Sequence, residues 1–365
     1  MKVRYSYLKQ QFSNCPDLWK KLKKFVATGD FTLGNELLNF EKKFAKLIGT
    51  KFAVGVNSGT DAVKLSLKAL NIKPGDEVIT AANTFVATVG AIKELGAKIV
   101  FVDCDDTFCV NADLIEKKIT KKTKAIVPVH FTGYMPNMKK INLIAKKYKL
   151  YVVEDACQSI LGSYNNKNAG TWGITGAFSL HPLKNINVWS DGGVITTNNK
   201  KIYNKLCLLR NHGLRDRDNM EIFGYNSRLD TFQAVVGNWI LPKAKQISNK
   251  RIEHAKYLDN GLRKIKQIQI PERKKNIRIV YHLYIVFAEQ RNALLKFCIK
   301  KGIEAKIHYP IPAYKQKPFK KIYQRNIFPV TDSHLNKIIS FPCDQHLEKK
   351  QLDYIIKTVN NFYEK

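Results

Sequence analysis

The stretch FAVGVNSGTDAVKLSLKAL, residues 52–70, decides the fold class because it joins a strand to a helix through a polar turn. Phe52–Val56 is typical of a short buried strand, and apolar residues then recur at helical spacing. Ser58-Gly59-Thr60 lies where the helix begins. The free N–H groups of a helix start suit a phosphate, and glycine allows it to approach the backbone closely. A Ser or Thr that only caps the helix is the alternative.

The same alternation continues along the chain. Further strands are predicted at Glu77–Thr80, Lys98–Val102, Ala125–Val129 and Leu150–Val153, with helices at Thr84–Leu95 and Met138–Tyr148. This order predicts an α/β domain whose largely parallel sheet is wrapped by helices. Ligands bind at the carboxyl ends of the strands in such sheets, and both Ser58 and Asp155 fall at such ends.

The last third of the chain predicts a second, smaller α/β domain. A long helix runs from about Asp230 to Leu262, with a break at Leu241-Pro242. A strand at Val280–Phe287 and helices at Asn292–Lys300 and Glu348–Tyr363 follow it. We therefore expect a large domain over residues 1–240, which includes the N-terminal segment, and a small domain over residues 241–365.

Composition limits the classes of function. The chain has 365 residues, of which 44% are hydrophobic, so it has enough apolar residues for both cores. Its 62 Lys and Arg against 30 Asp and Glu give a net charge of +32. These cations are scattered, and no nucleic-acid-binding motif accompanies them, so we expect no nucleic-acid partner.

Cysteine usage and hydropathy indicate the compartment. The seven cysteines are odd in number and form no CxxC pair, which argues against a disulfide framework and against a metal site. The N-terminus lacks the apolar core of a signal peptide. No run approaches the roughly 18 apolar residues that a membrane span needs. The sequence therefore predicts a cytoplasmic protein without a membrane partner.

Two residues are candidates for the chemistry of an active site. Asp155 ends the strand VVED and could pair with a cationic ring nitrogen, cap a helix or bind Mg²⁺. Lys184 lies in SLHPLKN, residues 179–185, where desolvation would make its amine a nucleophile toward aldehydes; an ordinary surface lysine is the alternative. A phosphate site, an acid and a reactive lysine are together what pyridoxal phosphate (PLP) requires.

A series of segments in this order resembles the DegT/DnrJ/StrS family of PLP-dependent nucleotide-sugar aminotransferases. They are NSGTDA (57–62), PGDEVI (74–79), NTFVAT (83–88), EDACQ (154–158), residues 179–193, LRNHG (209–213), GYNSRL (224–229) and HYP (308–310). The resemblance covers nearly the whole chain. It implies the PLP-dependent transferase fold type I, which is like that of aspartate aminotransferase.

The resemblance implies a role for each matching position. Lys184 would bond to the cofactor aldehyde, and Asp155 would pair with the pyridine nitrogen. The other implied cofactor contacts are Ser58, Gly59, Thr60 and Ser179 at the phosphate, Gln158 at the 3′-oxygen, Phe85 on the ring face and Asn226 from the partner subunit of a homodimer. The implied substrate contacts are Arg228, His308, Tyr309 and His181. Without the family, Phe85 is a core residue, Asn226 a turn residue and His308 a hydrogen-bonded loop histidine.

The resemblance also implies the reaction, which is transfer of the amino group of L-glutamate to a nucleotide-linked keto sugar. Lys184 favours transamination over the dehydration that relatives with His at this position perform. Residues 181–184 are similar to those of members that act at C3, so we expect a dTDP-3-keto-6-deoxyhexose to become a dTDP-3-amino-3,6-dideoxyhexose for surface glycans such as lipopolysaccharide. His181 stands where Tyr or Phe is common, which leaves the aminated carbon open.

The sequence leaves alternative substrates and one alternative class of function open. UDP-linked 3-keto or 4-keto sugars are alternative substrates. A non-catalytic regulator or a nucleic-acid-binding protein on the same fold is the alternative from another class. A regulator would be expected to have lost Lys184 or Asp155, and the chain keeps both.

Overall fold

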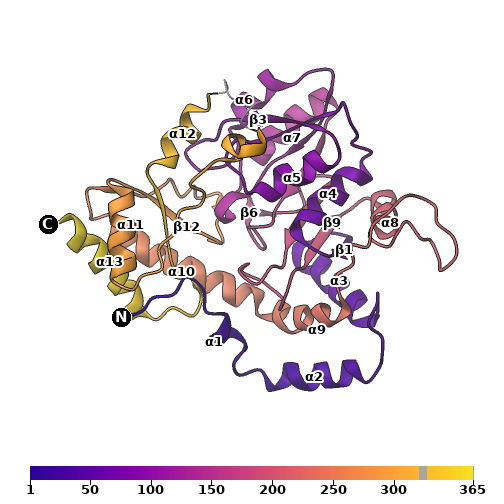
Figure 1. Ribbon diagram of the computed structural model, residues 1–365, viewed down its shortest axis with the longest axis horizontal. Helices are drawn as coiled ribbons and strands as arrows, with labels where there is room; N and C mark the ends of the chain where they lie inside the picture. The colour runs from indigo at the N-terminus through magenta and orange to yellow at the C-terminus, as the bar shows by residue number, and fades with distance from the viewer. Residues whose placement is uncertain (320–326, 365) are drawn as a thin grey trace.

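The centre of the molecule is a seven-stranded sheet, seen in a computed structural model that describes residues 1–319 and 327–364 (Figure 1). The strand order is β1-β9-β8-β5-β4-β2-β3. The strands are β1 (Phe52–Val56), β2 (Glu77–Ala81), β3 (Lys98–Val102), β4 (Thr123–Val127), β5 (Tyr151–Asp155), β8 (Thr175–Ser179) and β9 (Gly193–Thr197). Of these strands β9 alone runs opposite to the other six, so the prediction of a largely parallel sheet is confirmed.

Helices cover both faces of this sheet, as Figure 1 shows. Successive residues of β1 point to opposite faces, so Ala53 joins one hydrophobic core and Val54 the other. Burial on both faces explains why the strands are near-continuous apolar runs. The helices of this lobe are α3 (Asn35–Ile48), α4 (Gly59–Ala69), α5 (Val86–Glu94), α6 (Ala112–Ile115), α7 (Met138–Tyr148), α8 (Lys200–Leu209) and α9 (Thr231–Ile240), with 3-10 turns at Glu116–Lys118 and Phe131–Gly133.

A second lobe is built on a three-stranded sheet in the order β10-β12-β13. The predicted helix break is confirmed, since α9 ends at Ile240 and a 3-10 turn, Leu241–Lys243, precedes α10. The elements of this lobe are α10 (Ala244–Leu262), β10 (Ile268–Gln269), β12 (Tyr284–Ala288), α11 (Arg291–Lys300), α12 (Pro329–Leu335), β13 (Ile338–Phe341) and α13 (Lys349–Tyr363), with 3-10 turns at Ala313–Lys315 and Lys317–Phe319. The domain boundary at 240/241 stays a prediction.

One predicted strand of this lobe is wrong in its first half. Val280–Phe287 was expected to be continuous, but β12 begins only at Tyr284. Tyr281 adopts a left-handed conformation with φ of 47°, which interrupts the extended backbone and leaves His282 in a loop. A small sheet pairs β11 (Ile277–Arg278) with β6 (Ser163–Tyr164), which in turn pairs with β7 (Lys167–Asn168), so this loop is anchored to the large lobe.

The N-terminal segment contacts both lobes. Val3 forms a parallel bridge with Ile303, in which the Val3 N–H donates to Gly302 O at 2.9 Å. Helices α1 (Leu8–Phe12) and α2 (Pro16–Val26) then lead to the large lobe, where α2 packs against α9. Figure 1 shows both chain ends at the same side of the molecule. Within the ranges described above, the structure has no helix long and apolar enough to cross a membrane.

Candidate active site

The three segments predicted to carry chemistry meet at the carboxyl edge of the sheet. They follow β1, β5 and β8. The Cys157 thiol lies 3.8 Å from Gly59 O, and a Cβ added to Gly59 would lie only 2.6 Å from Ser179 Cβ. Ser179 and Cys157 therefore pack directly against Gly59 at the start of α4, which leaves no room for a side chain there. Ser58 also caps α4, since its hydroxyl accepts from Asp61 N–H at 3.1 Å, so the capping alternative holds as well.

Asp155 is a buried carboxylate with a fixed orientation. The Thr88 hydroxyl donates to its Oδ2 at 2.7 Å, and the Cys157 N–H donates to its Oδ1 at 3.2 Å. Its backbone is held as well, because Asp155 N–H donates to Pro128 O and His130 N–H donates to Asp155 O, both at 3.0 Å. Together these contacts present a negative charge at the end of β5 without rotational freedom.

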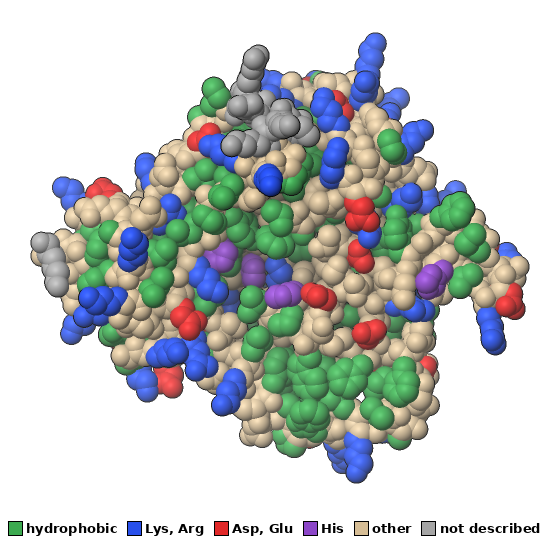
Figure 2. Space-filling model, viewed as in Figure 1, with side chains coloured by type: hydrophobic (Ala, Val, Ile, Leu, Met, Phe, Trp, Pro, Cys, Tyr) green, Lys and Arg blue, Asp and Glu red, His purple; other side chains and the backbone are tan. Residues whose placement is uncertain are grey.

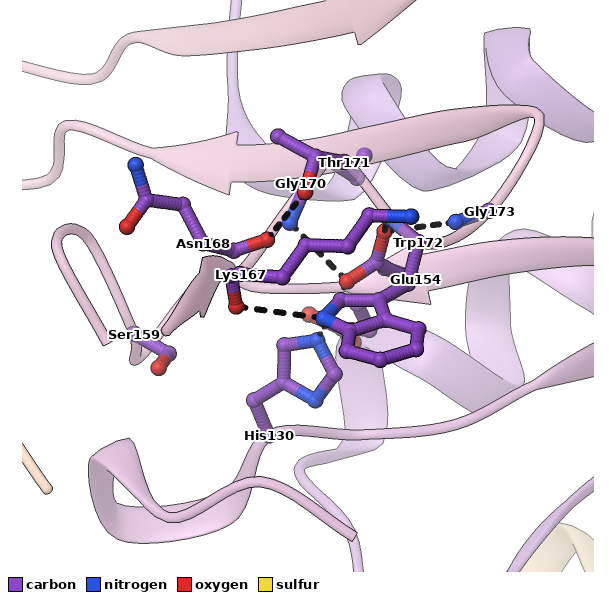
Figure 3. Close-up of polar contacts among 12 residues, drawn as sticks. His130, Glu154, Ser159, Lys167, Asn168, Gly170, Thr171, Trp172 and Gly173 are labelled. Carbon is purple, nitrogen blue, oxygen red and sulfur yellow. Dashed lines mark hydrogen bonds and ion pairs between the residues drawn. The ribbon is translucent and has the colours of Figure 1, made fainter. Parts of the chain in front are cut away.

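The neighbouring Glu154 points to the other side of the sheet and forms a buried network that the sequence analysis missed (Figure 3). Glu154 and His130 are both fully buried, with His130 Nε2 lying 2.8 Å from Glu154 Oε2. The carboxylate also accepts backbone N–H groups of Gly170, Trp172 and Gly173 at 2.7–2.9 Å. The available signal was the pair Glu154-Asp155 itself, since adjacent strand residues face opposite sides and only one of them can face a ligand.

Lys184 lies half-buried in the loop after β8, as its predicted role requires. The Asn187 side-chain amide shapes this loop by donating to Pro182 O at 2.7 Å and to Lys184 O at 3.0 Å. Burial lowers the pKa of the Lys184 amine, and the nearby Cys157 and Asp155 only partly oppose this change. A larger share of the amine is therefore neutral and nucleophilic at neutral pH.

Histidines surround this lysine. Figure 2 shows histidine side chains gathered in the hollow near the middle of the face. His282 Nε2 lies 3.5 Å from Lys184 Nζ, and the sequence analysis missed it because it lies inside the predicted strand. His308 Nδ1 contacts Ser340 Oγ at 2.9 Å, and burial lowers the pKa of His308 to about 4, with further contributions from Lys306 and Lys184. His181 is exposed, and its Nδ1 accepts from Leu183 N–H at 3.2 Å.

Gln158, Phe85 and Tyr309 line the same region. Gln158 Oε1 accepts from Thr132 N–H at 2.7 Å, which leaves the Gln158 NH₂ group to donate elsewhere. The Phe85 ring is 47% exposed, so it is not the core residue of the alternative reading, and its centroid lies 5.6 Å from that of Tyr309. Burial, with Asp155 adding to it, raises the pKa of Tyr309, so the phenol stays protonated.

Asn226 and Arg228 are the two predicted residues that lie elsewhere. They line a second pocket of about 230 Å³ together with Phe31, Asn57 and Asp230. As far as the structure describes the chain, none of the residues around Lys184 lines this pocket. Asn226 is exposed, and Arg228 Nη1 donates to Asn211 Oδ1 at 3.2 Å.

The geometry fits PLP. The site offers a buried acid, an amine of lowered pKa and a helix start at Gly59, whose free N–H groups suit a phosphate. A side chain is excluded at Gly193 too, where a Cβ would lie 2.1 Å from Ser58 O. These are the three kinds of contact that the cofactor needs.

Comparison with known proteins gives matches over almost the entire chain. The model of the DegT/DnrJ/EryC1/StrS aminotransferase family matches residues 16–360. A "Pleiotropic regulatory protein" of Geobacillus stearothermophilus is 33% identical over 100% of this chain and 99% of its own. A dTDP-3-amino-3,6-dideoxy-alpha-D-galactopyranose transaminase of Aneurinibacillus thermoaerophilus is 36% identical over 95% of both chains. A UDP-N-acetyl-3-dehydro-alpha-D-glucosamine 3-aminotransferase of Acidithiobacillus ferrooxidans is 36% identical over 92% of this chain and 91% of its own.

Solved structures agree with this assignment. The crystal structure of DesV from S. venezuelae, in complex with a ketimine intermediate, has a TM-score of 0.97 at 32% identity and covers 100% of this chain and 99% of its own. The structure of ntda from Bacillus subtilis, with the bound cofactor PMP, has a TM-score of 0.94 at 29% identity and covers 100% of this chain and 86% of its own. The chain therefore belongs to the DegT/DnrJ/EryC1/StrS aminotransferase family and is a PLP-dependent sugar aminotransferase.

Proposed function

We propose that this enzyme transfers the amino group of L-glutamate to a nucleotide-linked keto sugar, preferably a dTDP-3-keto-6-deoxyhexose, to give a dTDP-3-amino-3,6-dideoxyhexose. The observation that carries the reaction is the convergence of Lys184, Asp155 and the Gly59 backbone at one edge of the sheet. The name of the Aneurinibacillus relative supports this sugar. The Acidithiobacillus relative supports the alternative, a UDP-linked 3-keto sugar. A UDP-linked 4-keto sugar also stays open.

The side chains divide the work of the reaction. PLP, when bound, supplies an electrophilic aldehyde and an electron-withdrawing ring. Asp155 would hold its ring nitrogen, and the Gln158 NH₂ group would hold its 3′-oxygen. Ser58, Gly59, Thr60 and Ser179 would hold its phosphate, with Phe85 against its ring. The Lys184 Nζ would accept and return the proton that moves during amino transfer, which its lowered pKa favours.

The substrate side of the site would use neutral hydrogen-bonding groups. We assign this role to His308, Tyr309 and His181. With its pKa lowered to about 4, His308 is uncharged at pH 7, and the Tyr309 phenol is protonated. Such groups suit sugar hydroxyl and carbonyl oxygens, which carry no charge.

A homodimer would complete each active site. Asn226 and Arg228 lie on the surface in a pocket that Phe31 also lines. An aromatic surface cluster continues from there, in which Trp19 is 59% and Phe31 53% exposed, and Phe232 also lies at the surface. Figure 2 shows hydrophobic side chains gathered there, over the region of α2 and α9. Exposed apolar patches of this kind mark protein contacts, and a second copy of the chain would bring Asn226 to the cofactor phosphate of its partner.

Mixing two inactive variants tests this sharing. Lys184→Ala and Asn226→Asp homodimers are both expected to be inactive, the second because it places a carboxylate at a phosphate. In their heterodimer one site would carry both changes and the other would carry neither. Random assembly at equal amounts should therefore restore about a quarter of wild-type activity. Co-expressed variants that stay inactive, despite heterodimers being isolated through two tags, would show that the sites are not shared.

The substrate is tested by incubating the enzyme with glutamate and a panel of dTDP- and UDP-linked 3-keto and 4-keto sugars. Products are identified by mass spectrometry and NMR. We expect fastest amination of the dTDP-3-keto-6-deoxyhexose at C3, and the proposal fails if no keto sugar in the panel is aminated. The Geobacillus relative is named a regulatory protein, and a non-catalytic regulator would aminate no sugar of the panel. Lys184 and Asp155 favour the enzyme, because a regulator needs neither.

We also infer a cytoplasmic location. All seven cysteines lie in the described part of the chain as free thiols, which suits a reducing compartment. The amino sugars made there would serve surface glycans.

A further inference from the structure

We propose that His282 is the hydrogen-bond acceptor that holds the free Lys184 amine in place whenever Lys184 is not bonded to the cofactor. This makes His282 a positioning residue for the reacting nitrogen, and the inference rests on the proposed function of Lys184.

The contact joins two rigid backbones. His282 Nε2 lies 3.5 Å from Lys184 Nζ, although 98 residues separate them. The Asn185 side-chain amide donates to Val280 O at 2.8 Å, so the lysine loop is tied to the histidine loop. Arg251 holds the other side by donating from Nε to Tyr281 O and from Nη2 to His282 O, both at 3.0 Å. The imidazole is therefore presented to Lys184 by a loop that is fixed at three carbonyl groups.

The chemistry of the pair sets the direction of the hydrogen bond. When Lys184 is an ammonium group it has donors and no acceptor, so His282 Nε2 then accepts and the imidazole proton lies on Nδ1. Nδ1 is buried and has no hydrogen-bond partner among the described residues, so the contact with Lys184 is the hydrogen bond that decides the tautomer. The distance of 3.5 Å is long for such a bond, which is common at catalytic contacts before substrate binds.

The surroundings keep this acceptor uncharged. Burial lowers the pKa of His282 well below its ordinary value, and Lys184, Arg251, His308 and His181 lower it further. On the other side of Lys184, the Asp155 carboxylate already accepts from Thr88 and Cys157. Burial and Asp155 raise the pKa of the Cys157 thiol, which therefore stays protonated. His282 is thus a neutral acceptor placed to fix the amine.

The function of such a contact is to orient the amine. Lysine has four rotatable side-chain bonds, and a free ammonium would sample many positions. Holding Nζ in one orientation removes the entropic cost of ordering the side chain from each proton transfer. The Phe variant should therefore lose kcat, while the KM for glutamate should change little.

The test uses three variants at position 282. His282→Gln keeps a polar atom near the ε position, His282→Asn places its amide nearer the backbone, and His282→Phe has no acceptor. We expect kcat to fall at least about tenfold in the Phe and Asn variants and much less in the Gln variant. His346→Gln, which changes an exposed histidine, is the control and should match the wild type.

A second readout needs no turnover. Trace acylation of the apoprotein at a series of pH values, with the Lys184 peptide quantified by mass spectrometry, reports the pKa of that amine. Loss of an acceptor removes stabilisation of the ammonium, so this pKa should be lower in the Phe and Asn variants than in the Gln variant and the wild type.

The outcomes separate the two proposals. Unchanged kcat and unchanged labelling in all three variants would overturn the role of His282, even in an enzyme that aminates sugars. If the labelling changes as expected but no sugar in the panel is aminated, the contact stands and the proposed substrate class falls. If the Phe variant does not fold, the difference in kcat and in labelling between the Gln and Asn variants still tests the role of His282.

Discussion

Replacement of Lys184 by Ala is expected to abolish amino transfer, with kcat falling at least about 10³-fold. The reason is that the variant lacks the nitrogen that would both bond to the cofactor and carry the proton. One measurement is steady-state amination of the keto sugar. The other is the absorbance spectrum of the PLP-reconstituted protein, in which the band of PLP bonded to a lysine should be absent.

The matched control is Lys201→Ala, which removes an exposed lysine on α8 and should leave both activity and spectrum unchanged. Added small amines should restore part of the activity of the Lys184 variant, since they can replace a missing proton carrier. Full activity without any added amine would mean that another group performs the chemistry.

Replacement of Glu154 by Leu is expected to lower the free energy of unfolding by about 3–5 kcal/mol. The change removes the acceptor of three backbone N–H groups and leaves His130 buried without its partner. Urea unfolding of the apoprotein, followed by circular dichroism, measures the difference.

Glu116→Gln is the control for that experiment, because Glu116 pairs with Lys147 at the exposed surface. Surface pairs contribute little to stability, so its midpoint should match the wild type. If the Glu154 variant unfolded at the same urea concentration as the wild type, the buried network would have no stabilising role.

The local sequence pattern was sufficient to predict the bounds of those helices and strands that lie next to turn residues. The bounds of Phe52–Val56, Lys98–Val102 and Met138–Tyr148 were all predicted as they occur. Each is an uninterrupted apolar or amphipathic run next to turn residues. The strands β8 and β9 were not predicted, because TGAFS and GVITT are small and partly polar. They lie in the middle of the sheet because of their pairing partners, which single-sequence pattern does not reveal.

The site shows the same division between local pattern and tertiary contact. The motifs identified Asp155 and Lys184 as a pair, and the structure brings both to one edge of the sheet. His282 stayed hidden because VYHLYIVF is an almost uninterrupted run of apolar and aromatic residues, as in a buried strand, and only the left-handed Tyr281 removes His282 from that strand. Glu154 was overlooked because its partners lie in the loop at 170–173, whose approach depends on the tertiary fold.

The bridge between Val3 and Ile303 has a consequence for synthesis on the ribosome. At about 5–20 residues per second, roughly 15–60 s separate the emergence of these two residues, because about 300 residues lie between them. All seven strands of the central sheet have been translated by residue 197, so that sheet has time to assemble first. Val3 therefore waits outside the ribosome for its partner while the central sheet can already assemble.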